Sequence, residues 1–135
     1  MINYATYDAT TGRINSIGQC ELADIDLQKP WGSSFLAIPV TSAATYNGHY
    51  IDVSADPHVC LARPTLPDFD TTEITADGID TATLDVGEAF TVTIDDVDIV
   101  VTDGSLEITA ASPASFAVRV VHWPYLTREW TVNAS

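Results

Sequence analysis

Hydrophobic and polar residues alternate with a period of two through the last part of the chain. The segment 89–94, for example, places Phe90, Val92 and Ile94 on one face and Thr91 and Thr93 on the other. This period, with many β-branched residues, is typical of half-buried strands and not of helices. It predicts seven strands, at residues 72–76, 81–86, 89–94, 97–102, 105–110, 116–122 and 129–134.

Turn residues separate these segments. Asp77-Gly78 follows the first strand, and Asp95-Asp96 interrupts the pattern between the third and the fourth. Asp103-Gly104 lies between 97–102 and 105–110 and predicts a β-hairpin there, because a type I′ turn needs positive φ at both central residues. Seven short strands with this spacing predict an immunoglobulin-like (Ig-like) antiparallel β-sandwich over residues 72–135.

The first part of the chain is less regular. Two strands around Asp8–Gly12 read as a hairpin, and a helical turn or more is predicted before Pro30. Pro39 lies within a strand and makes that strand an edge, because proline cannot donate to a ladder. A second hairpin-like pair follows. The predicted elements are strands 2–7 and 13–17, a helical segment 22–28, and strands 35–40, 50–53 and 59–62.

Residues 63–71 contain Pro64 and Pro67 and read as a linker between these two parts. The predicted organisation is therefore a β-hairpin-rich N-terminal docking domain at 1–62, a linker at 63–71 and an Ig-like domain at 72–135. The fold class is all-β: a C-terminal Ig-like antiparallel β-sandwich preceded by a smaller β-rich docking segment.

Composition and charge restrict the possible partners. The chain has 135 residues, of which 46% are hydrophobic, and a formal net charge of −14. Nucleic acids and anionic membranes are recognised by clustered Lys and Arg, so neither is an expected partner. The longest apolar run is far shorter than the ~20 residues that cross a bilayer, so no membrane insertion is expected. No basic and apolar leader is visible, so no secretory signal is expected.

Motifs for catalysis and for cofactors are not recognisable. Most acids fall at strand ends and turns, where Asp bonds the local backbone. There is no Gly-x-Ser-x-Gly elbow, P-loop or zinc motif. Asp95, Asp96 and Asp98 cluster, but without a twelve-residue calcium loop they read as a solvated turn. We therefore expect no enzyme, no cofactor and no metal, and we expect Cys20 and Cys60 to be free thiols.

The N-terminal part is rich in aromatic residues for so irregular a segment, and residues 32–48 carry no charge. Surfaces of this composition form the centres of protein interfaces, although ordinary core packing is the alternative interpretation. A third interpretation makes Trp31, Tyr46, His49 and Tyr50 a weak stacking platform for surface glycans. The candidate interface residues are Tyr4, Tyr7, Trp31, Phe35, Leu36, Ile38, Tyr46 and Tyr50.

The chain also resembles a family of small virion proteins of tailed phages, which are associated with the tail tip or fibres. The likeness begins at residues 7–14 with Gly18, continues through 49–52, Arg63-Pro64 and Leu66-Pro67, and extends over an Ig-like module at 76–82, 101–104, 124–126 and 130–134. The family pattern has Pro-Gly-Tyr before the penultimate strand, where this chain has Pro113-Ala114-Ser115-Phe116.

This resemblance implies a structural component of the virion, assembled in the host cytoplasm, in the tail, tail tip, baseplate or fibre attachment. The uncharged, aromatic first half beside an acidic sandwich further leads us to expect that residues 1–62 contact other virion subunits, or further copies of the chain, and that the Ig-like domain at 72–135 points outward. It supplies no catalytic residues. Two alternatives stay open, namely a capsid decoration protein and a host-surface glycan or receptor-binding module for host attachment.

Overall fold

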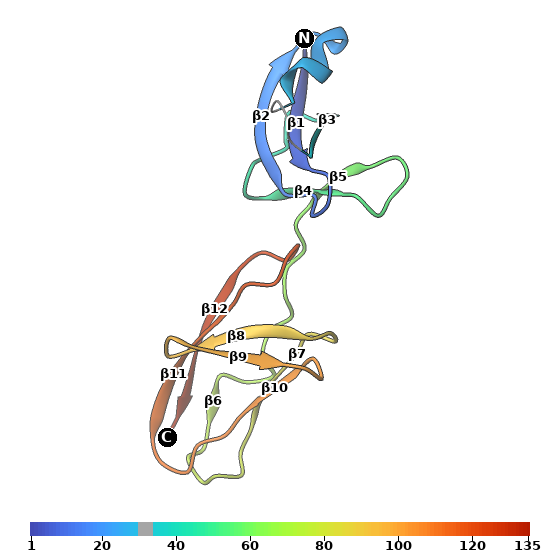
Figure 1. The fold of residues 1–135 in the computed structure, drawn as a ribbon. Coiled ribbons are helices and arrows are strands. Elements are labelled where there is room, and N and C mark those ends of the chain that lie inside the picture. Colours follow the sequence, from blue (N-terminus) through green and yellow to red (C-terminus); the bar gives the residue numbers. More distant parts are fainter. Residues whose placement is uncertain (30–33) are drawn as a thin grey trace. The chain divides into compact units, whose positions relative to one another are not determined.

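The computed structural model describes residues 1–29 and 34–135, and almost every regular element in it is a β-strand (Figure 1). The chain is all-β, as predicted. It divides into two units, which we call the first unit (Met1–Arg63) and the second unit (Pro64–Ser135).

The described part of the first unit contains a sheet of three strands and a ribbon of two. Strands β1 (Ile2–Asp8), β2 (Ile14–Cys20) and β3 (Phe35–Val40) form an antiparallel sheet in the order β2-β1-β3. Strands β4 (His49–Asp52) and β5 (Val59–Ala62) form an antiparallel ribbon. Both predicted hairpins are therefore confirmed, and β3, which contains Pro39, is an edge strand as expected.

The turn between β1 and β2 explains why this hairpin forms. One carboxylate oxygen of Asp8 accepts hydrogen bonds from the backbone N–H groups of Thr10 (2.7 Å) and Thr11 (3.0 Å). Gly12 follows with φ +77°, a conformation that favours glycine. The carbonyl of Gly12 accepts a hydrogen bond from the N–H of Ile51 at 2.9 Å. A Cβ at Gly12 would lie 1.9 Å from the Ile51 carbonyl oxygen, so glycine is required where this turn meets β4.

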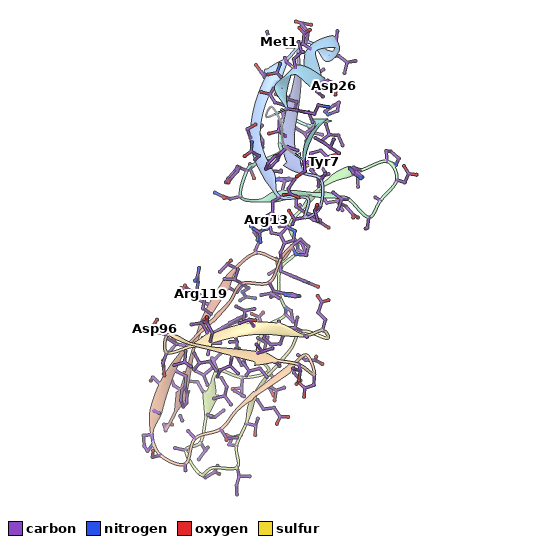
Figure 2. The ribbon with its side chains drawn as sticks, viewed as in Figure 1. Met1, Tyr7, Arg13, Asp26, Asp96 and Arg119 are labelled. Atoms are coloured by element: carbon purple, nitrogen blue, oxygen red, sulfur yellow. The ribbon has the colours of Figure 1, made fainter. Side chains whose placement is uncertain are left out.

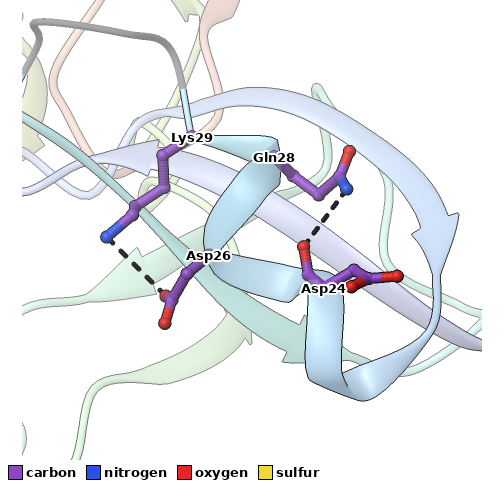
Figure 3. Close-up of polar contacts among 4 residues, drawn as sticks. All are labelled: Asp24, Asp26, Gln28 and Lys29. Carbon is purple, nitrogen blue, oxygen red and sulfur yellow. Dashed lines mark hydrogen bonds and ion pairs between the residues drawn. The ribbon is translucent and has the colours of Figure 1, made fainter.

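The predicted helical segment is a 3₁₀ helix, η1 (Leu22–Gln28). The Gln28 side-chain amide donates to the Asp24 carbonyl at 3.2 Å, and Lys29 lies 3.6 Å from the Asp26 carboxylate (Figure 3). None of its residues is fully buried, so these local bonds and partial packing hold η1 in place.

The second unit contains seven strands in two sheets. They are β6 (Glu73–Ile74), β7 (Ala82–Asp85), β8 (Phe90–Ile94), β9 (Val97–Val101), β10 (Ser105–Ile108), β11 (Ala114–Val120) and β12 (Arg128–Ala134). The larger sheet has the order β6-β12-β11-β8-β9, and β10 pairs with β7 in the smaller one. The β6–β12 pair is parallel and the other pairs are antiparallel.

The two sheets enclose one apolar core, which makes the second unit a β-sandwich. Strands β12, β11 and β8 take the places of strands G, F and C of an Ig-like sandwich, while β7 and β10 take those of B and E. The buried core residues are Leu66, Phe69, Ile74, Ala82, Leu84, Phe90, Val92, Val101, Leu106, Ile108, Val118, Val120, Val132 and Ala134.

The predicted hairpin at Asp103-Gly104 is wrong. β9 pairs with β8 and β10 pairs with β7, so this Asp–Gly pair connects strands of different sheets. Gly104 has φ +80°, and its carbonyl accepts the N–H of Val86 at 2.8 Å. A Cβ at Gly104 would lie 2.7 Å from the backbone nitrogen of Glu88. The glycine is needed for this close approach of two backbones and not for a hairpin.

The type I′ hairpin is instead formed by Asp95-Asp96, between β8 and β9. Asp95 has φ +48° and Asp96 has φ +68°, and two-residue hairpins favour such values because they match strand twist. The N–H of Asp95 donates to the Ala117 carbonyl (3.0 Å), and the Asp95 carboxylate accepts the Ala117 N–H (2.9 Å). These bonds to β11 stabilise the turn.

The predicted linker is also wrong, because residues 64–71 pack within the second unit. Leu66 is 2% exposed and Phe69 is 7% exposed, and the Phe69 ring meets Trp130 edge to face at 5.2 Å. Arg128 donates to the Leu66 carbonyl at 3.2 Å and pairs with the Asp68 carboxylate at 2.6 Å. The prolines suggested a free segment, but the apolar residues between them belong to the core.

Candidate interaction surface

Strand β5 is apolar along its whole length and is partly exposed. Because side chains alternate across a strand, Cys60 shares a face with buried Ile51, whereas Val59 and Leu61 lie on the opposite face with Tyr50 and with Asp52, whose carboxylate accepts hydrogen bonds from Ser54. Val59 is 41% exposed and Leu61 is 40% exposed. The ribbon has only two strands, so β5 pairs with β4 and with no further strand in the described part of the first unit.

A groove with a volume of about 410 Å³ runs along β5. None of the described residues that line it is an Asp, Glu, Lys or Arg. We define the β5 surface as this groove together with Tyr50; it comprises Pro39, Val40, Thr41, His49, Tyr50, Val59, Cys60, Leu61 and Ala62.

The only titratable side chains of the β5 surface are His49, Tyr50 and Cys60. The backbone N–H of Thr45 donates to His49 Nδ1 at 3.1 Å. Burial raises the pKa of the Cys60 thiol, which keeps it protonated. The groove therefore suits an apolar, uncharged partner segment.

The residues predicted as an interface do not form one surface. In the β1–β3 ladder, Tyr7 pairs with Leu36, whereas Tyr4 pairs with Pro39. Strand alternation therefore places Tyr7, Leu36 and Ile38 on one face of the sheet and Tyr4 and Phe35 on the other.

Tyr7 belongs to the core, and its assignment to an interface is wrong. Its side chain is 3% exposed and packs with Ala5, Ile14 and Ile51. The hydroxyl shares a 2.7 Å hydrogen bond with Nδ1 of His58, and burial raises the pKa of the phenol. Ile38 is partly buried against the same cluster.

Tyr4 is half-buried above Gly18, where a Cβ would lie 2.7 Å from the phenol oxygen, and its hydroxyl donates to the Gln28 side-chain oxygen at 3.4 Å. Phe35 is half-buried and Leu36 lies near the exposed limit. Tyr46 is exposed in the loop before β4, whereas Tyr50 belongs to the β5 surface. Trp31 lies outside the described residues. For these residues the interface stays a prediction.

Val59 and Leu61 were not among the predicted interface residues. Their signal in the sequence is the uninterrupted apolar run of residues 59–62 next to a turn, without the polar alternation of a half-exposed strand. A run of that kind predicts a strand buried on both faces. The structure leaves it at the outside of a two-stranded ribbon, which could not be deduced without knowing the strand pairing.

The second unit has a separate concavity of about 360 Å³ on the larger sheet. Its lining includes Thr93, Asp96, Ala117, Arg119 and Glu129, and Arg119 and Asp96 are labelled in Figure 2. Arg119 Nε lies 3.4 Å from the Glu129 carboxylate, and both side chains are mostly exposed. Exposed ion pairs of this kind contribute little to stability, and the residues of this concavity offer no chemistry specific to one ligand.

Cys20 and Cys60 are both free, as expected. Within residues 1–29 and 34–135 no three His, Cys, Asp or Glu side chains are grouped closely enough to hold a metal ion. No described helix is long and apolar enough to span a membrane.

The aspartates whose pKa is shifted are held by turns and ion pairs. Backbone N–H groups lower the pKa of Asp8 and Asp77, and the Ser54 hydroxyl followed by its N–H lowers that of Asp52. Arg128 lowers the pKa of Asp68, first by hydrogen bonding and then by its charge. These carboxylates have structural roles in the turns and pairs that they stabilise.

Comparisons with known proteins give little. No family model and no curated protein matches the chain. One similar solved structure is a member of glycosyl hydrolase family 2 from Bacteroides cellulosilyticus, with 11% identity and a TM-score of 0.34. The match covers 98% of this chain and 21% of that one, so the chain spans about a fifth of its length. A likeness this weak carries no argument about fold or function.

Proposed function

We propose that this chain is a structural, non-catalytic component of a tailed-phage virion, in the tail, tail tip or fibre attachment, and that its first unit docks on a neighbouring subunit. The observation that carries the proposal is the β5 surface, an exposed apolar groove beside a small core. The resemblance of residues 7–14, 49–52 and the Ig-like module to small virion proteins supplies the setting.

Charge supports docking through the first unit. It carries six acidic residues against Arg13, Lys29 and Arg63, whereas the second unit carries thirteen against Arg119 and Arg128. Docking the less charged unit avoids the desolvation of many carboxylates. The uncharged lining of the β5 surface suits an apolar strand or ridge of the partner, because an unpaired charge would be costly to bury there.

The test is incorporation into particles of the phage that encodes the chain. Leu61→Asp places a charge in the middle of the β5 surface and should remove the chain from purified particles. Ile79→Asp introduces the same charge at an exposed apolar residue of the second unit and should leave incorporation unchanged. Circular dichroism and size-exclusion chromatography establish that both variants are folded before particles are compared.

Two outcomes contradict the proposal at different levels. If the wild-type chain is absent from purified particles, the virion role is wrong. If Leu61→Asp is incorporated as well as Ile79→Asp, docking through β5 is wrong. A high copy number per particle would favour capsid decoration over a tail position. Binding to a glycan array that is lost in Tyr50→Ala would favour a host-surface binding module.

A further inference from the structure

We propose that the open edge of β9 in the second unit is a second binding site, which accepts an extended, basic strand of another protein by β-strand addition. This site lies in a different unit and on a different surface from the β5 surface that is proposed to dock. Strand β9 is the last strand of the five-stranded sheet and pairs only with β8.

The side chains of β9 are unusually apolar for an open edge. Val97 is 60% exposed, Ile99 is 43% exposed and Val100 is 68% exposed, while Val101 is buried in the core. Every second residue of an edge strand directs its N–H and C=O away from the sheet, ready to pair with another strand. β9 therefore combines unpaired backbone groups with apolar side chains, which are the two features that strand addition uses.

Two features that commonly protect an edge are missing from β9. It contains no proline and no lysine, which are common edge protectors. The opposite edge of the same sheet, β6, is only two residues long, and β3 of the first unit carries Pro39. The single charge within β9, Asp98, accepts the Thr93 hydroxyl at 2.6 Å within the β8–β9 pair.

Both ends of β9 are anchored to the rest of the second unit. The Asp95-Asp96 turn is tied to β11 through the two hydrogen bonds between Asp95 and Ala117. The far end of β9 is anchored by buried Val101, which pairs with Phe90. A strand that is fixed at both ends loses little conformational freedom when a partner pairs with it, which favours binding.

The charges around β9 indicate which kind of partner strand would pair with its edge. Asp95, Asp96, Asp98 and Asp103 lie along or beside β9, and residues 64–118 contain no Lys or Arg. A second copy of this chain would bring two strongly acidic units together, which electrostatic repulsion opposes. The complementary partner is a segment that alternates apolar residues with Lys or Arg, so that its cations meet these carboxylates.

The probe is a synthetic peptide of about seven residues that alternates lysine and valine, titrated into the full-length chain at low salt. We expect amide shifts in the NMR spectrum that centre on residues 97–101, and slower amide exchange there. A peptide with glutamate in place of lysine should not bind, and neither should a lysine peptide with proline at its centre.

Variants separate edge pairing from simple charge attraction. Val100→Lys adds the usual edge protection and should weaken peptide binding by at least about tenfold. Ile79→Lys adds the same charge at an exposed residue away from the edge and should weaken it far less. The double variant Asp96→Asn with Asp103→Asn removes two charges and should weaken both the binding of the peptide and the salt dependence of that binding. Asparagine tolerates the positive φ at residue 96, so the turn is kept.

Several results would overturn the inference. They are equal binding of the lysine and proline-interrupted peptides, equal loss of binding in Val100→Lys and Ile79→Lys, or no binding of the lysine peptide. Concentration-dependent dimerisation that Val100→Lys abolishes would assign the edge to a second copy instead. None of these results bears on particle incorporation through β5, so the two proposals fail independently.

Discussion

The first and second units are both built from short antiparallel strands, yet their cores differ in size. Among the described residues, four form the buried cluster of the first unit, namely Ala5, Tyr7, Ile14 and Ile51, whereas fourteen form that of the second. Small domains bury a lower fraction of their surface and are marginally stable. The difference shows that similar strand content can give cores of very different size, and that the unit with the smaller core leaves apolar residues of β5 partly exposed.

The largest effect that distinguishes the units should come from Gly12→Ala. The added Cβ would meet the Ile51 carbonyl oxygen at 1.9 Å, and φ at this residue is positive. We expect a loss of at least about 3 kcal/mol, enough to unfold the first unit while the amide signals of the second stay native. Gly87→Ala is the control: its φ is +84° with open space around it, so only strain of about 1–2 kcal/mol is expected. Native amide signals in both units of Gly12→Ala would contradict the conclusion that residue 12 must be glycine.

A pair of core truncations compares the units directly. Ile51 and Leu84 are both fully buried, one in each core. Ile51→Ala and Leu84→Ala should each cost about 2–5 kcal/mol. We expect the loss to unfold the first unit and to leave the second folded with a lower denaturation midpoint, as followed by unit-resolved NMR during urea titration. If Ile51→Ala lowers the denaturation midpoint of the first unit less than Leu84→Ala lowers that of the second, core size does not explain the difference in stability between the units.

Arg128 tests whether residues 64–71 are an integral part of the second unit. Its guanidinium pairs with Asp68, donates to the Leu66 carbonyl and lies 4.8 Å from the centre of the Trp130 ring. Arg128→Gln should cost about 1–2 kcal/mol and increase amide exchange within residues 64–71. Arg119→Gln removes only an exposed ion pair and should change stability by less than about 0.5 kcal/mol. Unchanged exchange in Arg128→Gln would show that Leu66 and Phe69 alone hold the segment.

The smallest expected effect is on the pH dependence of stability, and here the two units should behave alike. Asp8 and Asp77 each accept two backbone N–H groups in a turn, and these bonds lower the pKa of both carboxyls. The stabilisation is present above the ordinary carboxyl pKa and is lost as the pH falls through the lowered value in the folded state. Below about pH 4, Asp8→Asn and Asp77→Asn should therefore lose less stability than the wild type, each in its own unit. An unchanged pH dependence in either variant would exclude that carboxylate as the cause.

The sequence predicted the strands well because alternation is a local signal. All seven strands of the second unit and both hairpins of the first lie where the pattern placed them. Pairing is not local, which is why Asp103-Gly104 was misread: the same dipeptide suits a hairpin and a crossing between sheets. The Pro-containing segment 64–71 was misread because two prolines outweighed Leu66 and Phe69. The predicted interface was divided because residues that are adjacent in sequence face opposite sides of a strand.

The contact between Gly12 and Ile51 also sets an order of events in the first unit. The β1–β2 hairpin joins residues that are close in the chain and can form early, whereas η1 and β3 lie between that hairpin and β4 in the sequence, so bringing β4 back costs more entropy. The Gly12 carbonyl receives its partner, the Ile51 N–H, only when β4 arrives. The local hairpin and the distant ribbon should therefore open as one cooperative block, with the Ile51 amide exchanging as slowly as the slowest protons of the β1–β2 ladder.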